Sequence, residues 1–484
     1  MICKQKSHWI ELNKEKRKKE LLPVNRRHFF KLAATSSVAL GLPWLFGCGN
    51  GNTGLSDSDK KKSSYYRREL WNDTRAEIKV DPYIELQDYS GPFKVDLKYT
   101  DFSREQLSNM LIMAHHYHYA MQKAYRNYVY NQFGYEGVIE SEEKIWGRMM
   151  LKESHNIIKN TMKINGKNLE AFMKHWQVDL NSLPGDHCEV IFEMPYRRQG
   201  IVTYNRCPLV AEYEANGRID ELHGVCMTRC LDVIERKAQL FNPDLGVNVI
   251  TIPPRQSENH ICCKFEIYYK SQGSQITEDV NSEIDPDKWD VRGELLVSPD
   301  VKLDDYSKQF RPDLRLTDFS REQLAQMYLS IHNYNFAMLK SYGAWCKDKL
   351  GGENITTMHS DVWSDELHID AQKIMARHLN TSGEGIDSFL KAFQVDITMQ
   401  PPNFDMNFEM PSEDHCIITF NRCSAVTAME LTGQREQMEK CCAMDMSIFN
   451  RSAAIHDPNM KLNFLQMLPR PAKDSVCCKW EIYC

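Results

Sequence analysis

The spacing of hydrophobic positions predicts helices first and strands afterwards, in the same order twice along the chain. After Ser103, apolar residues recur every three or four positions through Ala114, which is the pattern of one helix face. Ser103 and Gln106 form a capping-box pair at the start of this helix, and Ser320 and Gln323 repeat the pair. Each half is therefore expected to open with a long helix.

Later segments of each half predict a second helix around a tryptophan, a short third helix, and then two strand pairs separated by a further helix. The predicted tryptophan helices contain Trp146 and Trp363. The predicted strands and intervening helix of the first half are 189–194, 201–204, about 220–241, 247–252 and 261–268. Those of the second half are 406–410, 417–420, a helix ending at Asp457-Pro458, 462–467 and 476–483. Helices followed by β-β-α-β-β indicate an α+β fold with a mainly antiparallel sheet in each half.

Identical short motifs occur in both halves. TDFSREQL stands at 100–107 and again at 317–324, an offset of 217 residues. The offset falls to 216 and then 215 further along, which we attribute to small insertions in loops. We expect two homologous domains, 81–271 and 300–484, joined by an acidic linker at 272–299. A duplication of this kind predicts an internal pseudo-dimer descended from a homodimer.

The first 80 residues differ in character from the rest. Arg26 and Arg27 precede a short apolar stretch that ends at Cys48, an order similar to that of a twin-arginine export signal with a lipobox. Residues 1–47 carry a net charge of +7, whereas the whole chain carries −6. We expect residues 1–47 to be the signal, Cys48 to be lipidated, and 48–80 to be a flexible tether.

These features predict an exported protein anchored on the periplasmic or extracytoplasmic side of a membrane by its N-terminal lipid alone. The expected partners are the twin-arginine export machinery and a small-molecule ligand. The 484 residues are 42% hydrophobic and 26% charged, which is typical of a globular chain of two or three domains. No basic excess points to nucleic acid, and a mean hydropathy of −0.53 excludes a polytopic membrane protein.

One histidine and three cysteines recur at matched positions in the two halves. These are His115, Cys207, Cys226 and Cys263 in the first half and His332, Cys423, Cys442 and Cys478 in the second. Thiolate and imidazole ligands in this combination predict a transition-metal or metallo-cofactor site in each half. Disulfides, which are usual for buried cysteine pairs of exported proteins, and inert packing of the thiols are the alternatives.

The alternation of side chains along a strand sorts the adjacent cysteine pairs. Cys263 and Cys478 are expected to face the core, whereas Cys262 and Cys477 are expected to point outward. Cys226 and Cys230 lie four residues apart and share a helix face, but the second half has methionine in place of the second thiol. The first half is therefore expected to be the active copy.

Two arginines are candidates for binding an anionic cofactor or ligand. Arg206 precedes a matched cysteine, and Arg255 follows prolines where a strand leads into a loop. A surface ion pair is the alternative interpretation of Arg255.

Taken together, the motifs resemble a prokaryotic family related to the L-2-amino-thiazoline-4-carboxylic acid hydrolases. The shared features are the SREQL helix, the tryptophan of the second helix, and the segments Arg206-Cys207-Pro208, Cys226, Asn242-Pro243 and Cys263-Lys264-Phe265 with their second-half counterparts. The closing β-β-α-β-β unit is also similar, more distantly, to 4-vinyl-reductase-type domains. The hydrolase resemblance implies opening of a small ring, with Cys207 or Cys263 as nucleophile and His115 as base.

The sequence thus leaves three hypotheses. The first is an exported envelope lipoprotein that binds a metal or metallo-cofactor at its Cys/His sites for redox or ligand-linked work. The second is a hydrolase of small cyclic C–N substrates like the resembled family. The third is a non-catalytic ligand-binding protein held by disulfides.

Overall fold

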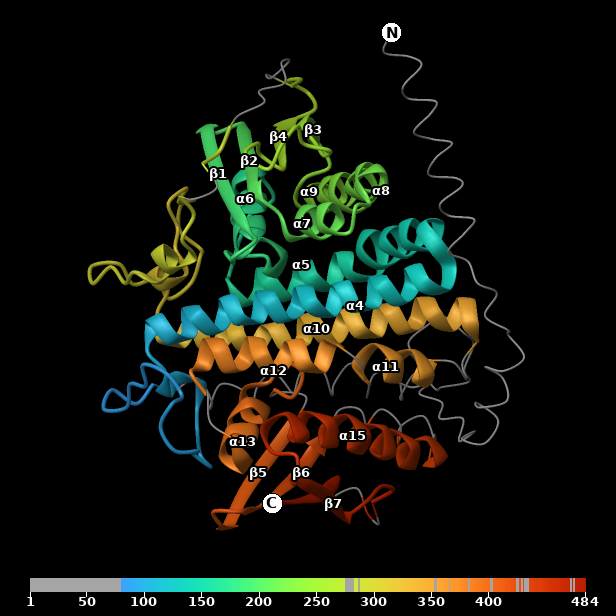
Figure 1. Cartoon of the computed structure of the whole chain (residues 1–484). Helices are drawn as coiled ribbons and strands as arrows, with labels where there is room; N and C mark the ends of the chain where they lie inside the picture. The colour runs from blue at the N-terminus through green and yellow to red at the C-terminus, as the bar shows by residue number, and fades with distance from the viewer. Residues whose placement is uncertain are drawn as a thin grey trace. The chain divides into compact units, whose positions relative to one another are not determined.

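Figure 1 shows a computed structural model of the chain. It describes residues 80–484 except for 275–282, 286–287, 352–354, 365, 382–383, 401–403, 424–425, 428–429, 431–434, 471 and 473–474. The expected export signal with Arg26 and Arg27, and the expected lipidation site Cys48, lie outside the described residues.

The first half opens with a long helix, α4 (Arg104–Lys144). It begins where the capping pattern predicts, because the Ser103 hydroxyl accepts the backbone N–H of Gln106. The backbone of α4 is broken at Gly134 (φ 68°, ψ −167°), where the chain starts a second helical segment. A π-helical turn (Ile145–Met149) continues this segment into α5 (Met150–Thr161), and Trp146 lies in that turn, within the predicted second helix. The short third helix is α6 (Leu169–Gln177), close to its predicted place.

The strands of the first half form one antiparallel sheet. They are β1 (Glu189–Tyr196), β2 (Gln199–Arg206), β3 (Leu245–Thr251) and β4 (Cys263–Tyr269), in the order β1-β2-β4-β3. Between β2 and β3 the chain forms α7 (Pro208–Ala215), α8 (Ile219–Val225), a second π-helical turn (Cys226–Asp232) and α9 (Val233–Phe241).

The second half has the same order of elements. Its helices are α10 (Arg321–Leu350), α11 (Ile355–Ser364), α12 (Glu366–Leu379), α13 (Gly385–Val395) and α15 (Arg435–His456). Its strands are β5 (Phe404–Ser412), β6 (His415–Cys423), β7 (Lys461–Gln466) and β8 (Cys478–Tyr483), in the order β5-β6-β8-β7. The predicted α+β class with antiparallel sheets is therefore confirmed.

Helices α4 and α10 lie side by side (Figure 1). Tyr125 stacks on Tyr342 with ring centroids 4.9 Å apart, and two turns earlier the His118 ring hydrogen-bonds the side chain of Asn335. Both pairs join positions 217 residues apart, so the two helices run in the same direction. All described residues belong to one compact unit.

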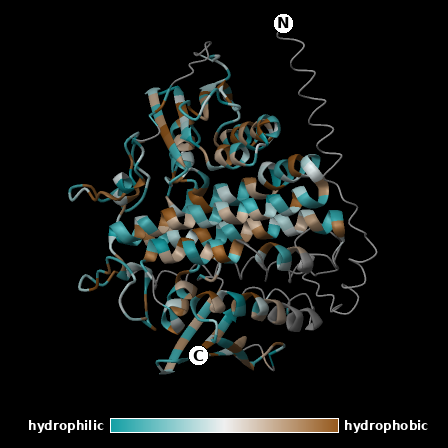
Figure 2. Ribbon diagram, viewed as in Figure 1, coloured by the Kyte–Doolittle hydropathy of each residue, from teal (hydrophilic) through white to brown (hydrophobic). Residues whose placement is uncertain are grey.

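Several of the buried residues of α4 are polar. Figure 2 shows hydrophilic and hydrophobic residues interspersed along α4 and α10. His115, His118, Gln122 and Arg126 of α4 are all buried. Since burying a polar group costs free energy unless it is hydrogen-bonded, this part of the core depends on specific partners. In the part of the chain that the structure describes, no helix is both long and apolar enough to cross a membrane.

The prediction that Cys262 and Cys477 point outward is wrong, since both are buried. Each cysteine lies one residue before its strand begins, where the alternation of strand side chains does not yet apply. The Cys262 thiol donates to the carbonyl of Asn205 at 3.4 Å, and the Cys477 thiol donates to the carbonyl of Asn421 at 3.5 Å.

Candidate functional site

The first half contains a cavity between α4, α6, α9 and the sheet that opens partly to solvent, and its empty space, counted together with the adjoining solvent, is about 960 Å³. Aromatic side chains form much of its wall, namely Trp146, Phe172, Trp176 and Phe265. The polar and reactive side chains that line it are His115, His118, Tyr119, His175, Asp179, Asn181, Ser182, Tyr204, Cys207, Arg229, Cys230, Lys237 and Cys263. Apolar walls with convergent polar groups are the usual form of a small-molecule site.

The π-helical turn at Cys226–Asp232 supplies Arg229 and Cys230 to the cavity. A π turn adds one residue to a helix, and such turns are frequent at functional sites. The corresponding helix of the second half, α15, is α-helical throughout its length.

The residue added by this π turn accounts for one change in the distance along the sequence between matched positions of the two halves. Cys226 and Cys442 match at 216, whereas Val247 and Leu462, which occupy the same register position on β3 and β7, match at 215. The expectation that these insertions lie in loops is wrong for this one, which lies at the π turn inside a helical segment. After the turn, Lys237 corresponds to Ser452.

The three cavity thiols differ in their acidity. The thiol of Cys226 donates to Cys230 and, with the nearby Arg229 guanidinium, lowers the pKa of Cys230. Burial raises the pKa of Cys207 to about 11 and that of Cys263 well above its usual value. Because the thiolate is the nucleophile, Cys230, which has the largest thiolate fraction of the three at neutral pH, is the best candidate nucleophile.

His115 presents one unprotonated nitrogen. Its Nδ1 lies 2.7 Å from the carbonyl oxygen of Leu180, which only accepts, so Nδ1 carries the proton and Nε2 does not. Burial lowers the pKa of His115, and the ring is therefore neutral at pH 7. A neutral imidazole with a fixed tautomer is suited to accept a proton.

Asp179 and Lys237 form an ion pair on the cavity wall, with 2.7 Å between Oδ2 and Nζ. Burial alone raises the pKa of Asp179, but the ammonium outweighs it and holds the pKa well below its usual range. The carboxylate is therefore charged across the physiological pH range.

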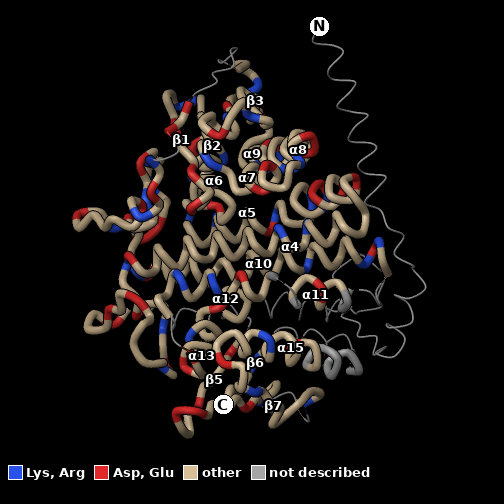
Figure 3. Tube along the Cα trace, viewed as in Figure 1, with Lys and Arg blue, Asp and Glu red and all other residues tan. Residues whose placement is uncertain are grey.

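A cluster of buried charges lies beside the cavity. Arg126 is 2.9 Å from Glu212 and 3.5 Å from Glu142, and Glu142 is 3.3 Å from Arg229. The cluster thus contains two cations and two anions, and its net charge is zero. Most other charged residues are spread over the described chain, as Figure 3 shows.

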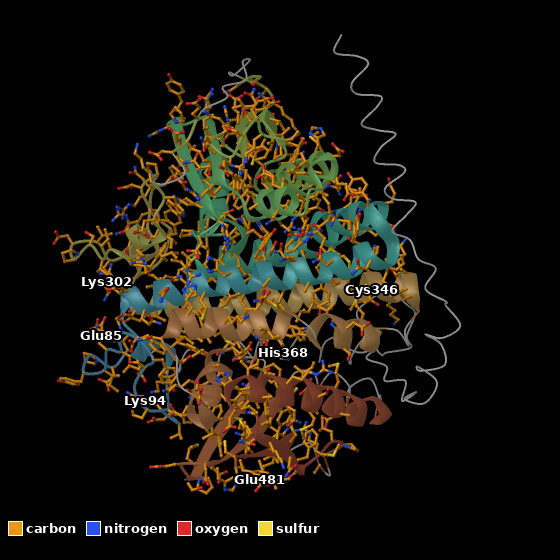
Figure 4. All side chains as sticks on the ribbon, viewed as in Figure 1. Glu85, Lys94, Lys302, Cys346, His368 and Glu481 are labelled. Atoms are coloured by element: carbon orange, nitrogen blue, oxygen red, sulfur yellow. The ribbon has the colours of Figure 1, made fainter. Side chains whose placement is uncertain are left out.

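The second half lacks several of these groups. Tyr204, which pairs with Cys263 in the sheet register, is replaced by Phe420, which pairs with Cys478. At the position of Lys237 stands Ser452, which hydrogen-bonds the buried His368 labelled in Figure 4. Ala392 stands at the position of His175.

The predicted metal ligands are only partly brought together. His115, Cys207 and Cys263 line the cavity, but Cys226 is not among its lining residues. In the second half, Nδ1 of His332 bonds the Ile397 carbonyl at 3.1 Å, and the side chain of Cys442 lies outside the described residues. Cys423 is half-buried and Cys478 is buried.

No group of three or more His, Cys, Asp or Glu side chains within the described ranges is placed to hold a metal ion. The predicted donors are therefore not gathered around one metal position in that part of the chain, and the metal stays a prediction. Cys188, Cys207, Cys226, Cys230, Cys262 and Cys263 all carry free thiols, so no disulfide joins these six.

The two arginine candidates face carboxylates. Arg255 contacts both carboxylate oxygens of Glu214, at 2.9 and 2.7 Å, and Arg470 repeats this contact with Glu430. The ion-pair interpretation of Arg255 therefore holds. Arg206 lies 3.7 Å from Glu189.

Comparison with known proteins supports one part of the resemblance. Residues 333–458 match the model of the L-2-amino-thiazoline-4-carboxylic acid hydrolase family. This match supports a relation to that family, although it lies in the second half and does not include the cavity. Comparisons with curated proteins and with solved structures found no match.

Sequence analysis did not include Cys230 among the candidate site residues and missed several other groups of the cavity. The missed residues are His118, His175, Asp179, Tyr204, Arg229 and Lys237. A signal was present at some of these positions, because His175 and Tyr204 correspond to Ala392 and Phe420 in the second half. We looked for residues that match between the halves, and a site carried by one half appears in the differences.

Proposed function

We propose that the chain is a hydrolase of small cyclic C–N substrates and that the first-half cavity is its active site. The observation that carries the proposal is the meeting of Cys230, His115 and aromatic walls in one cavity of small-molecule size. The family match in the second half supports the same reaction class.

The proposed reaction follows from the protonation states of Cys230 and His115. The Cys230 thiolate attacks the ring carbon of a C=N bond, and the electron pair of that bond moves to nitrogen, which takes a proton. Expulsion of one heteroatom then opens the ring. Nε2 of His115 takes a proton from water, the water oxygen bonds to the same carbon, and the thiolate leaves.

Cys230→Ser is expected to lower kcat/KM for hydrolysis of L-2-amino-thiazoline-4-carboxylic acid by at least about 10³-fold, since the nucleophile is removed. Substrate loss is followed by chromatography with the purified chain. Cys346→Ser changes a buried thiol of α10 outside the cavity (Figure 4) and is expected to stay within about twofold.

Three results would count against the proposal. If Cys230→Ser keeps its activity and Cys207→Ser or Cys263→Ser loses activity, the nucleophile is that other cysteine and not Cys230. Absence of hydrolysis of this acid and of related cyclic amidines by the wild-type chain would reject the reaction class. Stoichiometric metal in the purified protein would restore the metal hypothesis.

We further propose that the two halves are a duplicated domain arranged as an internal pseudo-dimer. Reciprocal contacts support this arrangement. Tyr89 donates its hydroxyl to the Gln394 side chain at 2.6 Å, and Tyr306, 217 residues later, donates to Gln177 at 2.7 Å. A self-complementary interface of this kind is what a twofold homodimer leaves after gene fusion.

Export and lipidation remain proposals that the N-terminal sequence supports. In cells labelled with radioactive palmitate, the wild-type chain is expected to incorporate label and Cys48→Ala is not, because the acceptor thiol is lost. Replacement of Arg26 and Arg27 by lysines is expected to retain the protein in the cytoplasm. Label in Cys48→Ala would contradict the predicted lipidation site.

A further inference from the structure

We propose that the second half completes the first-half active site, with Tyr334 and Asn335 of α10 acting as positioning residues for the polar end of the cavity. The inference rests on the proposed function in that it takes this cavity as the active site. It assigns a role to the second half, which lacks counterparts of Cys230, Lys237 and His175.

Asn335 does not line the cavity but contacts His118, a cavity residue, where the two halves meet. Its counterpart at the 217-residue offset is His118, and the two side chains hydrogen-bond each other. In a symmetric dimer this position would contact its own copy. In this chain the two residues differ in chemistry: His118 has an imidazole that lines the cavity, and Asn335 has an amide.

A chain of hydrogen bonds fixes the proton on His118. Arg229 can only donate, so Oε1 of Gln122 accepts its N–H, and Nε2 of Gln122 is left to donate. That nitrogen donates to Oδ1 of Asn181 at 2.7 Å and to Nε2 of His118. His118 therefore carries its proton on Nδ1, where Oδ1 of Asn335 accepts it.

This assignment separates the roles of the two histidines. Both ring nitrogens of His118 are engaged, and burial lowers its pKa to about 3, so it remains neutral and serves as a relay. Through Gln122 it holds Arg229, the cation next to Cys230. Asn335 thus influences the nucleophile through this chain and not by contact.

Tyr334 acts on the other charged group of the cavity. Its hydroxyl accepts from Nδ2 of Asn181 at 2.8 Å and lies 3.3 Å from Oδ1 of Asp179. The second oxygen of Asp179 faces Lys237. The tyrosine ring also meets the His118 ring edge to face at 5.4 Å. Tyr334 therefore orients the carboxylate that holds the cavity lysine.

The structure supplies a matched control for Tyr334. Tyr117, its counterpart at the same offset, is equally buried and donates to Asp396 of the second half at 3.3 Å. It does not line the first-half cavity. Tyr334→Phe and Tyr117→Phe therefore remove the same group from the same kind of contact, one at the proposed site and one away from it.

The kinetic test compares these two variants with L-2-amino-thiazoline-4-carboxylic acid as substrate. Tyr334→Phe is expected to lower kcat by about tenfold or more, because Asp179 is then misplaced and the reaction depends on the alignment of the cavity groups. The two variants are expected to lose similar amounts of thermal stability. Tyr117→Phe is expected to keep kcat and KM within about twofold. Equal kinetic effects of the two changes, or a larger effect of Tyr117→Phe, would overturn the inference.

A second test does not need turnover. The rate of Cys230 alkylation by iodoacetamide is measured against pH by mass spectrometry in the wild-type chain and in Asn335→Ala. In Asn335→Ala, His118 loses its acceptor, and Arg229 is expected to be held less firmly beside Cys230. The midpoint of the alkylation curve is therefore expected to rise by about one pH unit. Tyr117→Phe is expected to leave the midpoint in place.

The two tests separate the inference from the proposed function. A raised midpoint in Asn335→Ala supports the link between the halves even if the wild-type chain does not hydrolyse the chosen acid. An unchanged midpoint in a folded Asn335→Ala rejects the link whether or not hydrolysis is observed.

Discussion

Arg126→Met is expected to lower the free energy of unfolding by about 3–5 kcal/mol, because it leaves buried carboxylates without their main cation. Arg126 is 1% exposed and lies 2.9 Å from Glu212 and 3.5 Å from Glu142. Arg229 still faces Glu142, so Glu212 bears most of the loss. Methionine approximates the length of the arginine stem, which limits the packing change.

The measurement is chemical unfolding of both proteins at pH 7. Lys144→Met is the control, since Lys144 and Glu140 form a pair whose side chains are 42% and 34% exposed, and a change within about 0.5 kcal/mol is expected there. Adding Glu212→Gln to Arg126→Met is expected to recover part of the stability, because it removes the unpaired charge. An Arg126→Met protein within 1 kcal/mol of the wild type would contradict a tightly paired cluster.

This cluster also bears on the proposed site. Glu142 shares its carboxylate between Arg126 and Arg229, and Arg229 is the cation beside Cys230. Loss of Arg126 would leave Glu142 to compete more strongly for Arg229. The nucleophile therefore depends on charges that lie outside the cavity lining.

The elements could be predicted from local patterns because they depend on local physics. The hydroxyl cap at Ser103 and the alternation in the hairpin of β1 and β2 are fixed by residues close in sequence. The same order of elements in two halves made each prediction support the other. The α+β class and nearly every strand followed from these patterns alone.

The candidate site could not be derived in this way, since its residues meet through tertiary contacts. Nothing near Cys230 in sequence indicates that a π turn directs it into a cavity with His115. The burial of Cys262 depends on a carbonyl 57 residues away. Matched cysteines suggested a metal, but matching followed the shared fold: the proposed base His115 has the counterpart His332, whereas the proposed nucleophile Cys230 lies where the halves differ.

Lys237→Met is expected to destabilise the protein by about 3–5 kcal/mol at pH 7, because it leaves the Asp179 carboxylate buried without its cation. The second half already shows such a site. Asp396 corresponds to Asp179, Ser452 stands where Lys237 would be, and burial raises the pKa of Asp396 above its usual value. In Lys237→Met, Asp179 is expected to behave in the same way.

The sign of the pH dependence follows from this change. In the wild type the pKa of Asp179 is depressed, so its contribution to stability is present above the unfolded value near 3.9 and is lost as the pH falls toward the depressed value. In Lys237→Met the folded pKa is raised, so the contribution is present below about 3.9 and is lost as the pH rises through the raised value.

The difference in unfolding free energy between the two proteins is therefore expected to be largest near pH 7–8 and to shrink toward pH 4–5. Unfolding in denaturant at several pH values measures this difference. The contributions of the other carboxylates cancel in it because both proteins carry them. Lys237→Arg keeps the cation and is expected to keep the pH dependence of the wild type. A Lys237→Met deficit that stays constant with pH would mean that Asp179 is not held charged by Lys237, and the polar end of the cavity would then need a different account.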